Sequence, residues 1–145
     1  MEFHPMGLDA AASTFLGVWF GHVSVRKIEF ISPTIWLPTT IFAIFGIIFE
    51  LFSLLTSSLL LSAAAGILGI IFLCDALEFT RQQNRVKNGH APANPNNPRH
   101  ALFLREYASA TTLDLLKRDP IGKQVSPGEA IKLITEREFS ITNYP

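Results

Sequence analysis

The sequence contains a single cysteine, and this scarcity excludes several ways of building a small functional domain. Cys74 is the only cysteine in 145 residues and lies in an apolar segment. A disulfide framework or a cysteine-based zinc site therefore cannot form within one chain. Walker A, G-x-G-x-x-G, G-x-S-x-G and H-E-x-x-H motifs are also missing. We therefore expect no catalytic residues, no resident cofactor and no metal site.

Basic residues are missing from two long stretches of the chain. All 12 Lys and Arg lie at or after Arg26, and none lies in residues 1–25 or 28–80. In the polar part of the chain beyond about Phe79, basic residues are interspersed with acids, so a nucleic-acid-binding patch is not indicated. The start of the chain lacks the basic region of a signal peptide, and we expect the first apolar segment to be retained.

What the chain does contain is a long apolar run, from Thr39 to Leu77, in which Glu50 and Asp75 are the only charged residues. Because a membrane-crossing helix takes about 20 residues, the run accommodates two crossings with polar residues 56–58 as the turn. A shorter and less apolar segment precedes it. We predict an all-α membrane protein with three transmembrane helices, at about residues 7–25, 35–52 and 58–79, with a compact return over residues 30–38.

The positions of the basic residues predict the orientation of these helices. Three crossings bring Arg26 and Lys27 to the same side as everything after the third helix. The opposite side then holds only the N-terminus and the turn at residues 55–58, without a basic residue. Loops rich in Lys and Arg stay in the cytoplasm. We therefore expect the N-terminus outside, the C-terminus inside, and a multi-pass location in the lipid bilayer of a bacterial-type cytoplasmic membrane.

A proline-rich stretch divides the bundle from the remaining chain. The third helix is expected to continue into the cytoplasm and to end before Gly89, so that residues 1–88 form the bundle. Residues 89–100 include three prolines within seven positions, which favours an extended linker. Residues 101–145 form a predicted cytoplasmic helical tail. Its elements are an amphipathic helix over 101–118, a capped helix over 126–137 and a short strand over 139–144.

Small residues recur at helical spacing in the first and third segments, which are therefore expected to be in close contact. Such faces let helix backbones approach closely in lipid. On the first segment they suit either a partner subunit or packing within the same bundle, and packing within the bundle is favoured. The interaction candidates are Ser13, Gly17 and Gly21 on the first segment and Ser62, Gly66 and Gly69, with Ala65, on the third.

Charged side chains gather near the predicted cytoplasmic ends of the first and third helices. His22, Arg26 and Lys27 lie on the first, and Asp75 and Glu78 share a face of the third. Their similar depth predicts an ion-pair cluster that closes the bundle. The alternatives are a proton relay, or a head-group or quinone pocket that uses His22. A haem shared with another subunit through His22 is less favoured, because a single histidine does not specify haem.

Asp9 and Glu50, at the predicted outer end, have no basic residue of this chain to pair with. A water-exposed helix end explains them most simply. The alternatives are a cation site with His4, a hydrogen bond donated by a protonated acid, and pairing with a basic residue of another subunit.

The end of the third helix carries a distinctive run, E-x-x-x-Q-x-x-R-V-K-N-G-H-A-P-A-N-P, from Glu78 to Pro95. With GLDAAASTFLGVWFGH-V-x-V-R-K in the first segment and the aromatic return, it resembles a family of small three-helix bacterial membrane proteins of unknown function, over about residues 7–99. That family has an aromatic residue where this chain has His90. Many members also stop near residue 99, whereas this chain adds about 45 residues. The resemblance implies the three-helix topology and no activity.

Together these features predict a non-catalytic accessory or scaffold subunit of a larger membrane complex. Its partners would be membrane protein subunits or further copies of itself. The tail is too small to build its own core and is expected to dock on a partner or on the bundle. One rival is a homo-oligomeric small transporter or ion-conducting module that uses Glu50 with His22, Asp75 and Glu78. Another is a quinone- or haem-pocket subunit of a respiratory enzyme that uses His22.

Overall fold

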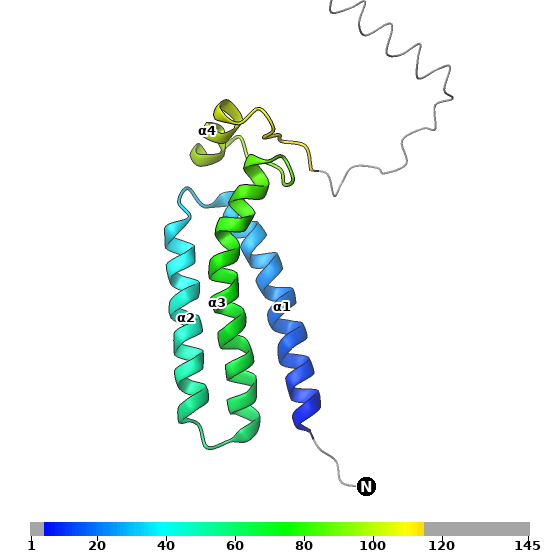
Figure 1. The fold of residues 1–145 in the computed structure, drawn as a ribbon, viewed down its shortest axis with the longest axis vertical. Coiled ribbons are helices and arrows are strands. Elements are labelled where there is room, and N and C mark those ends of the chain that lie inside the picture. Colours follow the sequence, from blue (N-terminus) through cyan, green and yellow to red (C-terminus); the bar gives the residue numbers. More distant parts are fainter. Residues whose placement is uncertain (1–4, 115–145) are drawn as a thin grey trace, which may run out of the picture. The chain divides into compact units, whose positions relative to one another are not determined.

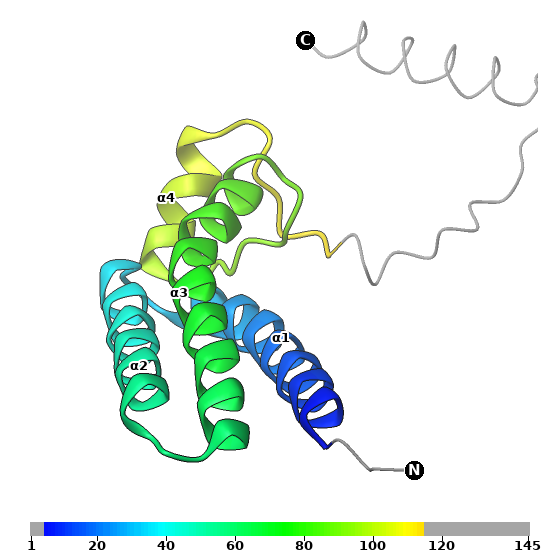
Figure 2. The same ribbon diagram turned by 60° about the horizontal axis from the view of Figure 1, so that its bottom comes forward.

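The computed structural model describes residues 5–114, which form four α-helices. They are α1 (Met6–Ile31), α2 (Trp36–Leu55), α3 (Leu59–Lys87) and α4 (Pro98–Glu106). The first three run up, down and up, with α3 between α1 and α2 (Figure 1). The short α4 contacts the end of α3 at which α1 also ends (Figure 2). We call this the cap end and the opposite one, where α2 turns into α3, the turn end. The predicted all-α fold is confirmed for residues 5–114.

The helix α1 is longer than the sequence pattern indicated. It continues to Ile31 instead of ending at about Val25, because no helix-breaking residue comes before Pro33. The predicted return over residues 30–38 is therefore reduced to residues 32–35. The extra turns carry the end of α1 toward α4 (Figure 1).

The starts of α2 and α3 follow from local sequence signals. Pro38 lies in the first turn of α2, where the missing N–H is not needed. Ser58 precedes α3, and its hydroxyl accepts a hydrogen bond from the backbone N–H of Leu61 at 3.5 Å. The continuation of the third helix to about residue 88 agrees with its observed end at Lys87.

Among the described helices, α2 and α3 are long and apolar enough to cross a membrane. Their most apolar windows are only 17% and 22% buried within the chain. A core helix of a water-soluble domain would bury most of such a window, because exposed apolar surface of this extent is rare in soluble monomers. The exposure of these helices supports a membrane location.

Glycines allow α1 to lie directly on α3. Gly17 and Gly21 are both buried. A methyl group at Gly17 would lie 2.7 Å from Cδ1 of Ile71, and one at Gly21 would overlap the carboxylate of Asp75. The predicted contact of the first and third segments is therefore present, and the chain uses both glycines internally. Ser13, the third member of this predicted face, is half-buried.

The small residues of α3 join it to α2 instead of α1. Gly69 lies against Glu50, and Gly66 lies against Ser53. The hydroxyls of Ser53 and Ser62 each donate to the other residue's carbonyl oxygen, at 2.8 and 2.9 Å. In lipid, burying apolar side chains does not drive helices to associate. Close backbone packing and hydrogen bonds between hydroxyl groups and carbonyl oxygens hold helices together there.

The three long helices meet in one hydrophobic cluster near the cap end. The cluster consists of Val25, Phe42, Ala76 and Phe79. Phe79 is fully buried, and its ring packs edge-on against that of Phe42 with centroids 5.1 Å apart. This cluster brings α1 and α2 together, although along most of their length each contacts α3 instead of the other.

Residues 89–97 fold back on α3, and the prediction of an extended linker over 89–100 is wrong. Gly89 makes the turn with a positive φ of 72°. Ala91 and Ala93 are buried in a second hydrophobic cluster with Val86 and Phe103. The prolines fix their own φ values but do not prevent a folded path, and the small alanines on either side of Pro92 fit against α3.

The helix α4 is shorter than the amphipathic helix predicted over residues 101–118. It begins at Pro98 and ends at Glu106. The side chain of Asn97 caps it by accepting a hydrogen bond from the backbone N–H of Arg99 at 3.1 Å, and Pro98 occupies the first helical position. Outside the described residues lie His4, the predicted helix over 126–137 and the predicted strand over 139–144.

Replacing Gly89 by Ala should destabilise the cap end. A φ of 72° is strained for other residues, and the new methyl group would overlap the carbonyl oxygen of Ser109. We expect a loss of about 1–3 kcal/mol, measured as a lower unfolding temperature of the detergent-solubilised protein. Gly7→Ala is the control, because nothing lies within 4 Å of its added methyl group. Equal losses in both variants would contradict the role given to Gly89.

Candidate functional site

Side chains from a distant part of the chain bond the C-terminal carbonyl groups of α1. Nδ2 of Asn94 donates to the carbonyl oxygen of Phe30 at 3.1 Å. Nδ2 of Asn97 donates to the carbonyl oxygens of Phe30 and Ser32 at 3.1 and 2.9 Å. The last four carbonyls of a helix have no partner inside the helix. The two asparagines supply hydrogen bonds that α1 cannot make itself.

Arg99 adds a positive charge to the same helix end. Its Nη2 donates to the carbonyl oxygens of Glu29 and Ser32 at 2.7 and 3.3 Å. Its Nη1 donates to Oε1 of Gln83 on α3 at 3.2 Å. No basic residue lies in the last turn of α1, and a cation there offsets the negative end of the helix dipole. Arg99 thus ties α1, α3 and α4 together.

The side chain of Glu29 is 1% exposed and is held by two partners. Arg99 Nη2 and His100 Nε2 each lie 3.0 Å from its Oε1. The Nδ1 of His100 accepts the backbone N–H of Asn94 at 2.9 Å. An accepting Nδ1 leaves the ring proton on Nε2, so in this arrangement the neutral imidazole donates to Glu29. We call Glu29, Asn94, Asn97, Arg99 and His100 the polar cap.

The predicted ion-pair cluster between the first and third helices does not form within residues 5–114. Glu78 pairs with Arg85 and Arg81, both on its own helix, and lies 3.5 Å from Arg81. Arg26 and Lys27 are exposed at the end of α1. The physical reason is that Arg81 and Arg85 lie one and two turns further along α3 on the same face as Glu78, so their side chains reach its carboxylate. Glu78 therefore pairs along α3 and not with α1.

Asp75 stands apart from these pairs, between α1 and α3. It is 7% exposed, its carboxylate packs on Gly21, and its Oδ2 is buried without a hydrogen-bond partner among the described residues. His22 is exposed on α1 and is, with Glu78, one of the ionisable groups whose charges act on Asp75. The structure therefore brings His22 near Asp75 without bonding the two.

An apolar groove lies between α1 and α2, with α3 as its floor. Its volume is about 350 Å³. Asp75 is the only residue of its lining that has an ionisable side chain. We call it the α1–α2 groove, and its lining consists of Leu16, Gly17, Trp19 and Phe20 from α1, Phe49 from α2, and Leu68, Ile71, Phe72 and Asp75 from α3.

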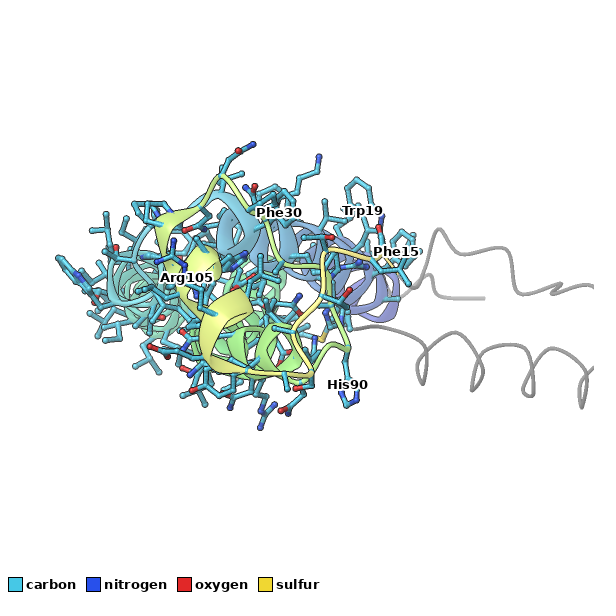
Figure 3. All side chains as sticks on the ribbon, turned by 90° about the horizontal axis from the view of Figure 1, so that it is seen from above. Phe15, Trp19, Phe30, His90 and Arg105 are labelled. Carbon is cyan, nitrogen blue, oxygen red and sulfur yellow. The ribbon has the colours of Figure 1, made fainter. Side chains whose placement is uncertain are left out.

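The outward side of α1 carries a second, shallower hollow of about 620 Å³. Phe15 is 69% and Trp19 is 60% exposed. Phe15 points outward from α1 on the side away from α2 (Figure 3), and Trp19 borders both this hollow and the α1–α2 groove. We call this surface the α1 outer face, and its residues are Ala10, Ala11, Thr14, Phe15, Val18 and Trp19.

The acids of the turn end do not gather into a cation site in the part of the chain that the structure describes. Glu50 is half-buried against Gly69, and Asp9 lies in the first turn of α1. No three His, Cys, Asp or Glu side chains among residues 5–114 come close enough together to hold a metal ion.

The polar cap was missed by the sequence reasoning, which assigned no role to Glu29. The hydrogen bonds of Asn94, Asn97 and Arg99 to residues 29–32 span 64 or more positions of the sequence. Helical spacing cannot reveal such contacts. The one available signal was Asn97-Pro98, which is typical of a helix start and argued against an extended linker.

Comparison with protein-family models identifies the family of this chain. A family model described as "Domain of unknown function (DUF4491)" matches residues 4–97. The chain belongs to this family. The DUF4491 region contains α1, α2, α3, Asn94 and Asn97, and it ends two residues before Arg99. The comparisons with curated proteins and with solved structures found no match.

Replacing Glu29 by Leu should weaken the polar cap strongly. Arg99 and His100 would then be buried without their shared acceptor, and losing one member of a buried pair costs about 3–5 kcal/mol. The measurement is thermal unfolding in detergent, together with the rate of proteolysis between α3 and α4. Glu106→Leu makes the same chemical change at an exposed position, where we expect no more than about 0.5 kcal/mol. Similar effects of the two changes would show that the cap adds nothing to stability.

Proposed function

We propose that the protein is an integral membrane protein with three transmembrane helices, acting as a non-catalytic accessory subunit of a larger membrane complex. The observation that carries the accessory role is the α1 outer face. It is an apolar surface on a helix whose opposite side is already fixed to α3. The proposed location is a bacterial-type cytoplasmic membrane.

Three spans are supported by the packing of α1 on α3. The helices α2 and α3 are long and apolar enough to cross a bilayer. The helix α1 has 26 residues, which corresponds to about 39 Å at 1.5 Å per residue, against a hydrocarbon thickness of about 30 Å. It contacts α3 through Gly17, Gly21 and neighbouring residues. A bilayer that surrounds α3 would therefore also surround α1.

The orientation is supported by the distribution of charge along the bundle. Every Lys and Arg of residues 5–114 lies in the last part of α1, the second half of α3 or α4, which are the segments at the cap end. The N-terminus of α1 and the turn end have none. Under the positive-inside rule the cap end is cytoplasmic and the N-terminus outside.

The accessory role is supported by how the chain uses its polar groups. The side chains of the polar cap bond other parts of the same chain, so their role is to stabilise the fold. The outward side of α1 carries a hollow formed by small side chains beside Phe15 and Trp19. Small residues let a second helix approach, and aromatic residues provide most of the contact energy in interfaces.

The orientation can be tested by thiol labelling. In a Cys74→Ser background, which removes the single native cysteine, Ser57→Cys reports on the turn end and Thr112→Cys on the cap end; both positions are exposed. A membrane-impermeant reagent added to intact spheroplasts should label Ser57→Cys and reach Thr112→Cys only after permeabilisation. The reverse pattern, or equal labelling of both, would refute the proposed topology.

The accessory role can be tested with a photo-crosslinking residue placed at Phe15 on the α1 outer face. We expect one adduct, to a protein that also co-purifies in fixed ratio in mild detergent. Ala11→Phe, which fills the hollow, should weaken that association about tenfold, equivalent to about 1.4 kcal/mol. The control crosslinker replaces Ile44, which is 51% exposed on α2, and should give no such adduct. A clean homo-oligomer would instead favour a transporter or ion-conducting module.

A further inference from the structure

His22 is an exposed polar side chain at the middle of the height of the bundle. Val25 of α1 and Phe42 of α2 lie in one hydrophobic cluster, so the two antiparallel helices are level there (Figure 1). His22 is about one turn nearer the turn end than Val25, which makes it level with the centre of α2. The 20 residues of α2 measure about 30 Å, the thickness of the hydrocarbon core. Under the proposed topology His22 therefore lies near the bilayer midplane.

Nothing within residues 5–114 satisfies this imidazole. His22 interacts electrostatically with Asp75 but is not hydrogen-bonded to it. Arg26, one turn closer to the cap end, is also exposed and has no ion pair in this part of the chain, whereas Arg85 pairs with Glu78. Ionisable side chains within a membrane almost always face the interior of a bundle and pair with another group. The surface that carries His22 and Arg26 is therefore expected to lie against protein instead of lipid.

This surface is continuous with the α1 outer face. One row of side chains follows α1 at four-residue spacing, so that its members are neighbours along one side of the helix. The row consists of Thr14, Val18, His22 and Arg26, all of them exposed. Its first two members line the hollow of the α1 outer face. A helix that fills the hollow and continues along the row would therefore pass over His22 and then Arg26.

We propose that the partner docked on the α1 outer face is a transmembrane helix that carries an aspartate or glutamate level with His22 and Arg26. The inference rests on the proposed accessory role and adds the chemistry of the partner. A carboxylate has two acceptor oxygens, so one acid can accept a hydrogen bond from the imidazole and another from the guanidinium. Pairing inside the interface offsets the cost that each of these groups has alone in hydrocarbon.

A second copy of this chain would not supply that acid. At this level it offers Asp75, which is buried against Gly21, and Glu78, whose side chain is 13% exposed and already paired. Two copies docked through this row would instead bring their own basic residues together, and like charges repel. A lipid phosphate stays at the bilayer surface. The long side chain of Arg26 can extend toward it, but an imidazole near the midplane cannot.

The first experiment links the partner's acid to position 26. In membranes that contain the Arg26→Lys variant, the lipid-soluble reagent dicyclohexylcarbodiimide adds to a carboxyl group. The new amine then attacks the carbonyl carbon and forms an amide, and dicyclohexylurea leaves with the carboxyl oxygen and the two hydrogens lost. We expect a link to an Asp or Glu in a transmembrane helix of the protein that is photo-crosslinked from Phe15. Lys27 is the matched control, because this exposed amine points to another side of α1 and should form no link.

The second experiment measures how tightly that protein associates. His22→Leu leaves the partner's acid without one donor and should weaken co-purification in mild detergent about tenfold or more, as expected for the loss of a hydrogen bond to a charged group. Lys27→Leu removes a charge from an exposed neighbouring position and should leave the association unchanged. Because His22 is exposed, thermal unfolding of the isolated chain should be the same with and without His22→Leu.

The outcomes separate this inference from the accessory role. An adduct at Phe15 without a link from position 26, a link to an acid of this chain, equal linking through Lys27, or an association that His22→Leu leaves unchanged would overturn the inference alone. The absence of any protein adduct at Phe15 would refute the accessory role and this inference with it.

Discussion

The arrangement of the described residues depends on how the end of α1 is satisfied. A helix that ends inside a structure leaves carbonyl groups without partners inside the helix, and burying each of them unpaired would cost about 1–3 kcal/mol. Here the segment from Asn94 to His100 returns across more than 60 positions of sequence to supply amide and guanidinium donors. The same segment places His100 and Arg99 on the buried Glu29. Because α1 otherwise contacts mainly α3, the polar cap fixes where α1 lies at the cap end and so where the α1–α2 groove closes.

The distinctive run at the end of α3 has a structural explanation in these contacts. Glu78 pairs with Arg85, and Arg85 donates to Gln82 at 2.7 Å, which gives three successive turns of α3 a common polar ladder. Gly89 then reverses the chain with a φ that other residues tolerate poorly. Asn94 completes the path by bonding α1. The run through which this chain resembles its family thus builds the cap end.

Local sequence patterns predicted the three long helices, because apolar runs, Pro33 and Ser58 act on their immediate neighbours. Spacing also selected Gly17, Gly21, Gly66 and Gly69, which do lie in helix contacts, although it could not tell that those of α3 face α2. The polar cap was beyond such reasoning. Glu29 and His100 are 71 positions apart, and no periodicity links them. The prolines of residues 92–98 suggested a linker because each restricts the backbone, but the buried alanines on either side of Pro92 show a segment packed on α3.

The two buried acids, Glu29 and Asp75, have opposite surroundings. Both are more than nine-tenths buried, and both lie where α1 meets other parts of the chain. Glu29 receives a guanidinium and an imidazole, whereas Asp75 receives no hydrogen bond to Oδ2 within the described residues. An acid that only filled space against Gly21 could be replaced by an apolar side chain of similar size without leaving any polar atom unsatisfied. What Asp75 adds at the contact of α1 and α3 is therefore a polar atom without a hydrogen bond among the described residues, in contrast to the bonded carboxylate of Glu29.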